Sequence, residues 1–269
     1  WVRQNEMRIL VFSQYFWPEN FSINDIAISL CKKGHQVEVL TGKPNYPRGE
    51  IFQGYKQLGC QLELHEGIMV HRIPLFARGR GGMRLLLNYL SFIFFGLVLA
   101  PWVLVNRKAD VIFVYGLSPI LQALPAIMIG WLKGIPVVLW VQDLWPESLS
   151  ATGYIKNTVV LKLVEYIVKY IYQRVDLLLV QSQAFVAPVE ALASGTPVIH
   201  YPNSVDESFS LPTTADVPDL NGLLHGFSIM FAGNIGSAQA VEVIIEAAML
   251  LREYTDIHFV VLGDGSRHD

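Results

Sequence analysis

Short apolar runs that alternate with longer helical patterns are the feature that most constrains this fold. Strand-like runs lie at residues 8–13, 37–41, 109–115, 136–141, 175–181 and 197–201. Helical patterns lie between most of them, over about 24–33, 83–105, 119–133, 156–174 and 183–193. Strands separated by helices predict βαβ units, in which the strands run parallel in one sheet. The chain is therefore expected to belong to the α/β class.

The 269 residues suggest about two domains at roughly 150 residues each. Residues 202–226 are rich in Pro, Ser, Asp and Gly and are interpreted as a linker after a first domain, 1–201. Residues 227–269 begin a second βαβ pattern, with a helix near 238–254. That part is short for a doubly wound domain of about 100 residues or more. Because the first residue is Trp and the last strand-like run lies near the end, we expect a fragment whose second domain is incomplete.

Composition and charge narrow the classes of partner. Hydrophobic residues make up 52% and charged residues 16%, against a usual value of about 25% charged, which excludes a disordered chain. Residues 1–201 carry a balance of +5 and residues 202–269 a balance of −8. A basic first part suits phosphate or anionic lipid. Nucleic acid is not expected as a partner, because no basic run is interleaved with aromatic residues.

Cysteine usage and the N-terminus indicate a reducing compartment. Cys31 and Cys60 form no CxxC pair, so neither a disulfide framework nor a thiolate zinc site is expected. The first residues show no basic segment followed by a long apolar core, so no signal peptide is visible. We expect a cytoplasmic protein.

Residues 85–105 form a run of 21 residues without a charge, long enough to span a bilayer. Three interpretations stay open: a core helix, a helix in the membrane surface, and a true span. Pro101, Asn88 and Ser91 argue against a span, as do the βαβ patterns on both sides. Anionic headgroups would favour the surface helix, because cations flank the run at Arg78, Arg80, Arg84, Arg107 and Lys108. The amphipathic stretch 159–174 is interpreted as a packed surface helix.

Metal chemistry is not indicated. The seven His residues form no HExxH motif or close pair, and there is no DxD pair, P-loop or GxSxG elbow. We expect neither a metal nor another cofactor.

Three loops follow predicted strands and carry the candidate chemistry, because ligands of open α/β sheets bind beyond the carboxyl ends of strands. QYFWPENFSIND follows the first strand, and TGKPNYPRGEIFQGY follows the second with the sugar-binding side-chain types Asn45, Tyr46 and Arg48. WVQDLWPES places Asp143 and Glu147 beside Trp140 and Trp145. A carboxylate there could accept a proton from a substrate hydroxyl. The alternatives are ordinary βα loops and, for Asp143, a helix cap or structural ion pair.

A fourth loop, FAGNIGSAQAVE, follows the first strand of the second domain. Gly233 and Gly236 permit close backbone approach, and a helix starting near Ser237 would offer amides to a phosphate. A plain strand-to-helix turn is the alternative.

Taken together, these strings resemble the GT-B glycosyltransferases of family 4. The similarity is to bacterial enzymes of capsule, O-antigen and colanic-acid synthesis, including the N-acetylfucosamine transferase type. It rests on MRILVFSQYFWPEN, KKGHQVEVLTGKPNYPRG, ADVIFVYGLSP, VVLWVQDLWPES, VDLLLVQSQAF, YPNSVDESF and FAGNIGSAQAVEVIIEAAMLL, in the order of the family. The resemblance implies two Rossmann-like domains with parallel sheets and a cleft between them.

The resemblance also implies a function: retaining, metal-independent transfer of a hexosyl or N-acetylhexosaminyl group from a nucleotide-sugar. The first domain would bind a lipid-linked glycan acceptor at the cytoplasmic face of the plasma membrane, touching the anionic surface through residues 78–108. A nucleotide-sugar epimerase of the same fold and a non-catalytic membrane-associated module remain alternatives. The basic flanks of 85–105 favour the transferase over the epimerase.

Carried over to this chain, the resemblance assigns Asp143 and Glu147 to catalysis. The acceptor would contact Glu19, Asn20, Asn45, Tyr46, Arg48 and Trp145. The donor would contact Phe21 and Ser22, which replace the usual Gly-Gly, together with Gly233, Asn234, Gly236 and Gln239. Asn234 and Gln239 stand where the family commonly has Arg and Lys, so Arg267 is the candidate cation for the diphosphate.

The string EALASGTPVI at 190–199 is similar to the segment around the second of two family glutamates that lie eight residues apart. Because it precedes the linker, we interpret it as a first-domain helix that ends at Gly195 and is followed by a strand. The family's late donor site is then expected beyond residue 269.

Overall fold

The computed structural model describes residues 6–79, 81–151, 157–204, 226–233, 235–236 and 239–263. The chain divides into two compact units. The first comprises Trp1–Ser148 with Asn157–Ser204, and the second comprises Leu149–Lys156 with Val205–Asp269. Most of the predicted linker, residues 205–225, lies outside the described residues.

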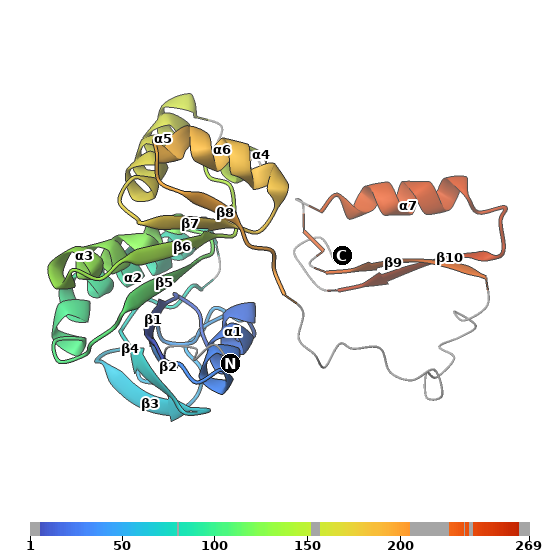
Figure 1. Cartoon of the computed structure of the whole chain (residues 1–269). Coiled ribbons are helices and arrows are strands. Elements are labelled where there is room, and N and C mark those ends of the chain that lie inside the picture. The colour runs from blue at the N-terminus through green and yellow to red at the C-terminus, as the bar shows by residue number, and fades with distance from the viewer. Residues whose placement is uncertain are drawn as a thin grey trace, which may run out of the picture. The chain divides into compact units, whose positions relative to one another are not determined.

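The first unit is built on an eight-stranded sheet with the order β3-β4-β2-β1-β5-β6-β7-β8 (Figure 1). All neighbours pair in parallel except β3, which is antiparallel to β4. This arrangement confirms the predicted α/β class. The strands are β1 (Arg8–Phe12), β2 (Gln36–Thr41), β3 (Gln61–His65), β4 (Ile68–Arg72), β5 (Val111–Gly116), β6 (Val137–Val141), β7 (Leu177–Val180) and β8 (Val198–His200).

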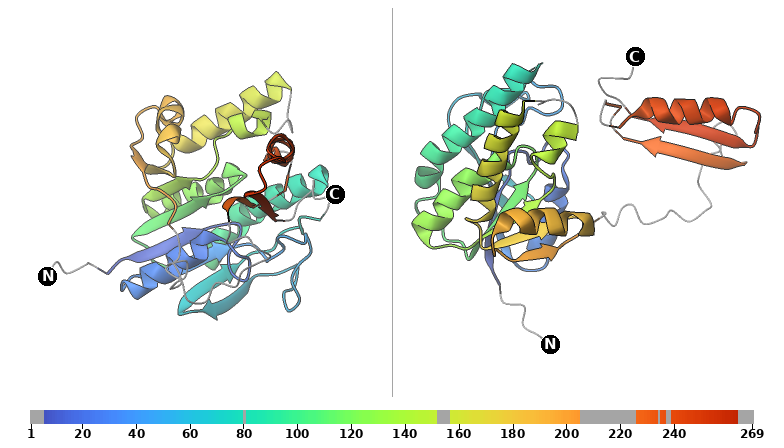
Figure 2. Two further views of the ribbon diagram at one scale, coloured as in Figure 1. Left: turned by 90° about the vertical axis from the view of Figure 1, so that its right-hand side faces the viewer. Right: turned by 90° about the horizontal axis from the view of Figure 1, so that it is seen from above.

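The central strands are nearly continuous apolar runs because both of their faces are covered. Along β1, Leu10 and Phe12 face one core, whereas Ile9 and Val11 face the other. The first core also receives side chains from α2 (Gly82–Val103), α3 (Ala123–Lys133), α5 (Thr158–Tyr172) and α6 (Gln183–Ala193). The second core is closed by α1 (Ser22–Lys32). Figure 2 shows α2, α3 and α5 side by side on one face of the sheet.

Helix α2 corresponds to the uncharged run of the sequence. It is the one helix of the described chain that is long and apolar enough to cross a membrane by length and composition. One side of it packs inward: Asn88, Phe92, Gly96 and Ala100 are buried. A Cβ at Gly96 would lie 2.9 Å from Cγ of Pro125 in α3, so the two helices approach closely at a glycine. The core-helix interpretation therefore accounts for one side of α2.

The hairpin of β3 and β4 was not predicted from the sequence. Glu66 and Gly67 join the strands with φ values of 49° and 80°, which is the backbone of a tight hairpin turn. On β3 the alternation of Leu62 and Leu64 with polar residues was present in the sequence. Both leucines are exposed, so an apolar-inward pattern would not have placed the strand correctly.

The interpretation of residues 190–199 is confirmed. Helix α6 ends at Ala193, and Ser194 and Gly195 have φ values of 51° and 105°. Such left-handed residues end helices. Strand β8 follows and pairs in parallel with β7 of the first sheet.

In the second unit, β9 (Phe227–Ala232) pairs in parallel with β10 (Ile257–Leu262), and α7 (Val241–Leu250) lies between them in the chain. This is the predicted βαβ pattern. The helix begins later than predicted, at Val241 rather than near Ser237. Gln239 N–H donates to the Gly236 carbonyl in a turn, and Ala240 has a φ of 46°, so these residues precede the helix.

We predict that the amides of β9 and β10 exchange with solvent faster than those of β1, β5 and β6. A two-stranded sheet is marginally stable, and Phe227, Met230 and Leu262 are more than half exposed. Hydrogen exchange monitored by mass spectrometry measures the difference. Equal protection in both sheets would contradict the prediction.

Candidate functional site

The candidate site of the first unit lies at the carboxyl edge of the sheet. Strand β1 pairs with β2 on one side and β5 on the other, so the chain leaves β1 and β5 in opposite directions. A crevice beyond the strand ends is expected at such a switch point. The loops that follow β1, β2, β4, β5 and β6 all meet at this edge.

Asn88 of α2 joins three of these loops. Its Oδ1 accepts from Gln14 Nε2 at 2.7 Å, and its Nδ2 donates to the Phe76 carbonyl at 2.6 Å and to Asn45 Oδ1 at 3.3 Å. Asn45 Oδ1 also accepts from the Arg78 N–H at 3.0 Å. Asn45 and Asn88 are fully buried. The loops after β1, β2 and β4 are therefore held by one buried hydrogen-bond network.

The same network reaches the loop after β5. Gln14 N–H donates to Gln122 Oε1 at 2.8 Å, and Gln122 Nε2 donates to the Leu117 carbonyl at 2.9 Å. Gln122 belongs to the short 3-10 helix η1 (Ile120–Gln122) and is buried. These buried hydrogen bonds restrain the loops that they join, although Gln14 Oε1 is buried without a partner among the described residues.

Glu19 fastens the loop after β1 to the loop after β2. Its Oε1 accepts from the N–H groups of Asn45 at 2.8 Å and Tyr46 at 2.7 Å, and its Oε2 from that of Phe16 at 3.3 Å. Glu19 is only 2% exposed. Burial raises the pKa of its carboxyl to about 7, because desolvation outweighs the three N–H donors that favour the charged form.

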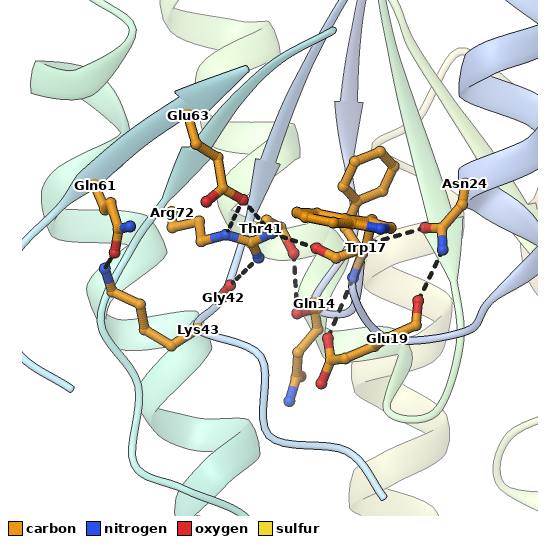
Figure 3. Close-up of polar contacts among 11 residues, drawn as sticks. Gln14, Trp17, Glu19, Asn24, Thr41, Gly42, Lys43, Gln61, Glu63 and Arg72 are labelled. Carbon is orange, nitrogen blue, oxygen red and sulfur yellow. Dashed lines mark hydrogen bonds and ion pairs between the residues drawn. The ribbon is translucent and has the colours of Figure 1, made fainter. Parts of the chain in front are cut away.

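Arg72 forms a second set of contacts that links segments at this edge (Figure 3). It pairs with Glu63 at 2.5 Å and donates to the carbonyls of Gly42, at 3.1 Å, and Trp17. Its side chain is fully buried. Nearby, Lys43 Nζ donates to Gln61 Oε1 at 3.1 Å, and burial lowers the pKa of Lys43. Arg72 thus ties the hairpin β3–β4 to the loops after β1 and β2.

The loops after β1 and β2 also carry a cluster of aromatic rings. Tyr15 and Phe21 stack with ring centroids 5.0 Å apart, and Tyr46 lies 5.2 Å from Phe21. The Arg78 guanidinium lies over the Tyr46 ring at 5.2 Å. Tyr46 and Phe21 are half-buried, so this cluster presents aromatic edges and a cation at the sheet edge.

Asp143 is positioned by the loop after β5. The Ser118 hydroxyl donates to Asp143 Oδ2 at 2.7 Å and accepts from Trp145 Nε1 at 2.9 Å. Next to it, Ser22 at the start of α1 shares a hydrogen bond of 2.7 Å with the Tyr115 hydroxyl. Burial raises the pKa of Tyr115; the hydrogen bond with Ser22 opposes this shift, and the charge of Asp143 adds to it. One carboxylate and several hydroxyl groups therefore meet at the switch point.

The predicted site residues fall into distinct groups. Glu19 and Asn45 are buried and bonded to other parts of the protein, whereas Asn20 and Arg48 are exposed. Glu147 is the exposed first residue of α4 (Glu147–Ala151). The predictions for Asn234 and Arg267 fall outside the described residues. Among the other donor candidates, Phe21 and Ser22 lie in the first unit at the start of α1. Gly233, Gly236 and Gln239 belong to the second unit, before α7.

No metal centre is found in the part of the chain that the structure describes, where His, Cys, Asp and Glu form no group of three. The sequence analysis missed several positioning residues: Gln14, Arg72, Tyr115, Ser118 and Gln122. The sequence did offer a signal for Asn88, because a polar amide within an otherwise apolar helix indicates a buried hydrogen-bonding role. Arg72 was missed because the hairpin that buries it was not predicted.

We predict that Glu19→Gln changes how stability depends on pH. The folded pKa of about 7 lies above the ordinary glutamate pKa of 4.5, so the wild-type chain takes up a proton on folding between these values. Its stabilising contribution is full below pH 4.5 and is lost as the pH rises through 7. The melting temperature of Glu19→Gln relative to wild type should therefore increase from pH 5 to pH 8.

The measurement is thermal unfolding at several pH values. The exposed carboxyl variant Asp25→Asn serves as a control and should show no such trend. A constant difference between Glu19→Gln and wild type across this range would contradict the assignment.

Comparison with known proteins identifies the family of this chain. The model of the glycosyl transferase 4-like domain matches residues 20–202, which include the end of the loop after β1 and the loops after β2, β5 and β6. The chain is 28% identical over 278 residues to the putative colanic acid biosynthesis glycosyl transferase WcaI of Escherichia coli (strain K12). That match covers 96% of this chain and 66% of the relative, so the chain spans slightly less than two thirds of its length.

Solved structures show the same fold. Sucrose-phosphate synthase from Thermosynechococcus elongatus matches with a TM-score of 0.61 and 9% identity, over 96% of this chain and 71% of that one. An E. coli trehalose-6-phosphate protein bound with UDP-2-fluoro glucose matches with a TM-score of 0.61 and 11% identity, over 97% and 65%. These structures are GT-B glycosyltransferases, so the predicted GT-B type of fold is confirmed. Since the family model covers more than half of the chain, this protein belongs to the glycosyl transferase 4-like family.

Proposed function

We propose that this chain is part of a glycosyltransferase that moves a sugar from a nucleotide-sugar to a glycan acceptor in surface polysaccharide synthesis. The observation that carries the proposal is Asp143, a half-buried carboxylate held at the switch point by Ser118. Support also comes from the relative named as a colanic acid biosynthesis glycosyl transferase. The neighbour bound with UDP-2-fluoro glucose supports a nucleotide-sugar donor.

In this proposal Asp143 receives the proton of the acceptor hydroxyl. Ser118 occupies Oδ2, and Oδ1 has no hydrogen-bond partner among the described residues, so it is available to a substrate. A carboxylate in such a position orients the hydroxyl and shares its proton as the new bond forms. Trp145, fixed by its own bond to Ser118, offers a ring face to the sugar.

Acceptor recognition is proposed for the exposed and half-buried groups around this carboxylate. Tyr46 with Arg78 offers an aromatic face and a cation, and Asn20 and Arg48 are exposed on neighbouring loops. Glu19 and Asn45 act indirectly, because they position the backbone of Tyr46. In the second unit, Gly233, Gly236 and Gln239 are proposed for the donor, as the family resemblance implies.

The chemistry is proposed to be retaining and metal-independent, with a hexosyl or N-acetylhexosaminyl group transferred. A lipid-linked acceptor at the inner face of the plasma membrane is part of the same proposal. It is supported by α2, whose outward side exposes Leu86, Leu90, Phe94 and Trp102. Arg84 lies exposed near the start of this helix.

We predict that Asp143→Asn in the whole protein lowers kcat by roughly 10²–10⁴, the usual value of general acid–base assistance. The donor KM should change little if donor contacts come mainly from the second unit. Steady-state kinetics on folded enzyme measures both constants. Product analysis with and without a lipid-linked acceptor separates transfer from epimerisation.

Two further variants sharpen this test. Asp25→Asn removes an exposed carboxylate on α1 and should leave kcat unchanged. Glu147→Gln probes the second predicted carboxylate. Near-normal kcat in a well-folded Asp143→Asn enzyme would end its catalytic assignment and make Glu147 the next candidate.

We also predict that residues 78–108 bind anionic vesicles peripherally, because cations flank an apolar helix. Sedimentation with vesicles at low and high salt measures the binding, which should weaken as salt rises. Binding that ignores both salt and lipid charge would refute this electrostatic model.

A further inference from the structure

Helix α5 has apolar residues on two sides. Val168, Ile171 and Tyr172 are buried against the sheet. On the outward side, Val159, Leu163, Tyr166 and Tyr170 are 73%, 59%, 69% and 44% exposed. Their spacing of four, three and four residues places them in one stripe along the helix. Packing within the first unit explains the first side and leaves the second unexplained.

The neighbouring helices α2 and α3 also expose apolar groups, and the end of the stripe Val159–Leu163–Tyr166–Tyr170 shares a groove with them. Trp131 of α3 is 81% exposed, and α2 exposes Phe94 and Trp102 at 59% and 77%. A groove of about 1040 Å³ touches all three helices and is lined by Leu97 of α2, Met128 of α3 and Tyr170 of α5 among others. The three helices also lie side by side in Figure 2. Exposed apolar groups on helices that share a groove are typical of protein or membrane contacts.

The charges on these helices have one predominant sign. Helices α2 and α3 contain no acidic residue, and α5 contains one, Glu165. Lys162 and Lys169 are exposed on α5 beside the stripe. Arg174, just after the helix, lies over the Tyr170 ring at 5.2 Å. Long basic side chains can lay their stems on apolar surface and keep the charge at its border.

These charges indicate whether the apolar face of α2, α3 and α5 contacts a second copy of the chain or a membrane. A second copy of this chain would bring the same cations to the same border, and like charges would oppose each other. An anionic bilayer offers hydrocarbon for the apolar stripe and phosphate for the border. A span through the bilayer is incompatible with the inner sides of α2 and α5, which are packed against the sheet.

We propose that α5 is a second lipid-contacting helix, so that the face formed by α2, α3 and α5 rests on an anionic membrane surface. The stripe of α5 lies at headgroup depth, with its tyrosines and basic residues at the interface. This inference deepens the proposed membrane association, which rests on residues 78–108 alone. Two separated helices define a plane, so they would also orient the protein on the membrane.

The test is vesicle sedimentation of the whole protein with phosphatidylglycerol-containing vesicles. The pair Leu163→Ser/Tyr166→Ser should weaken partitioning by about tenfold or more, because each removes apolar surface from the contact. A matched control is Leu62→Ser/Leu64→Ser on β3, whose leucines are 55% and 72% exposed. The control pair should bind like wild type.

The outcomes distinguish the role of α5 from the proposed membrane binding through residues 78–108. A third variant, Leu90→Ser/Phe94→Ser, changes exposed residues of α2. If this variant loses vesicle binding and the α5 pair does not, the role of α5 is overturned and α2 remains the membrane helix. Unchanged binding in both pairs would overturn both. A lowered melting temperature of the α5 pair without lipid would show that the stripe packs within the protein. Conversion of a dimer to a monomer by that pair would assign the face to a second copy.

Discussion

The hydrogen bonds of Asn88 are the interaction on which the carboxyl edge depends. One buried amide holds Gln14 after β1, Asn45 after β2 and the Phe76 carbonyl after β4. A buried amide without partners is costly, so the three loops must keep their positions for Asn88 to stay satisfied. Glu19 and Arg72 add further hydrogen bonds between the same loops. The half-buried groups of the candidate site rest on this buried layer.

Helix α2 thereby connects the two faces that the proposed function needs. Its inward side supplies Asn88 and Ser91 to the polar edge, where Phe76 N–H donates to Ser91 Oγ at 2.9 Å. Its outward side exposes the apolar residues proposed to meet lipid. One helix thus links the loops proposed to bind the acceptor to the surface proposed to contact the membrane. A lipid-linked acceptor held at that surface would then present its sugar to loops whose positions α2 fixes.

The strands and helices of the first unit were predictable because a parallel sheet buries both of its faces, and the resulting apolar runs are visible in the sequence. The turn at Ser194 and Gly195 was predictable for a similarly local reason. The hairpin β3–β4 was not, because Leu62 and Leu64 point their apolar side chains outward. Sequence also placed Asp143 at the strand edge but could not find Ser118, its partner 25 residues away.

The sequence by itself therefore determined the α/β class, the order of elements and the loops that carry polar groups, because these depend on local apolar periodicity. The tertiary structure decided which of those polar groups are available. Glu19 and Asn45 resemble ligand-binding residues in the sequence but are buried and bonded within the protein, whereas Asp143 is half-buried and its Oδ1 has no hydrogen-bond partner among the described residues. It also decided that α5 exposes an apolar stripe. Burial and hydrogen-bond partners arise from segments far apart in the chain, and no local pattern encodes them.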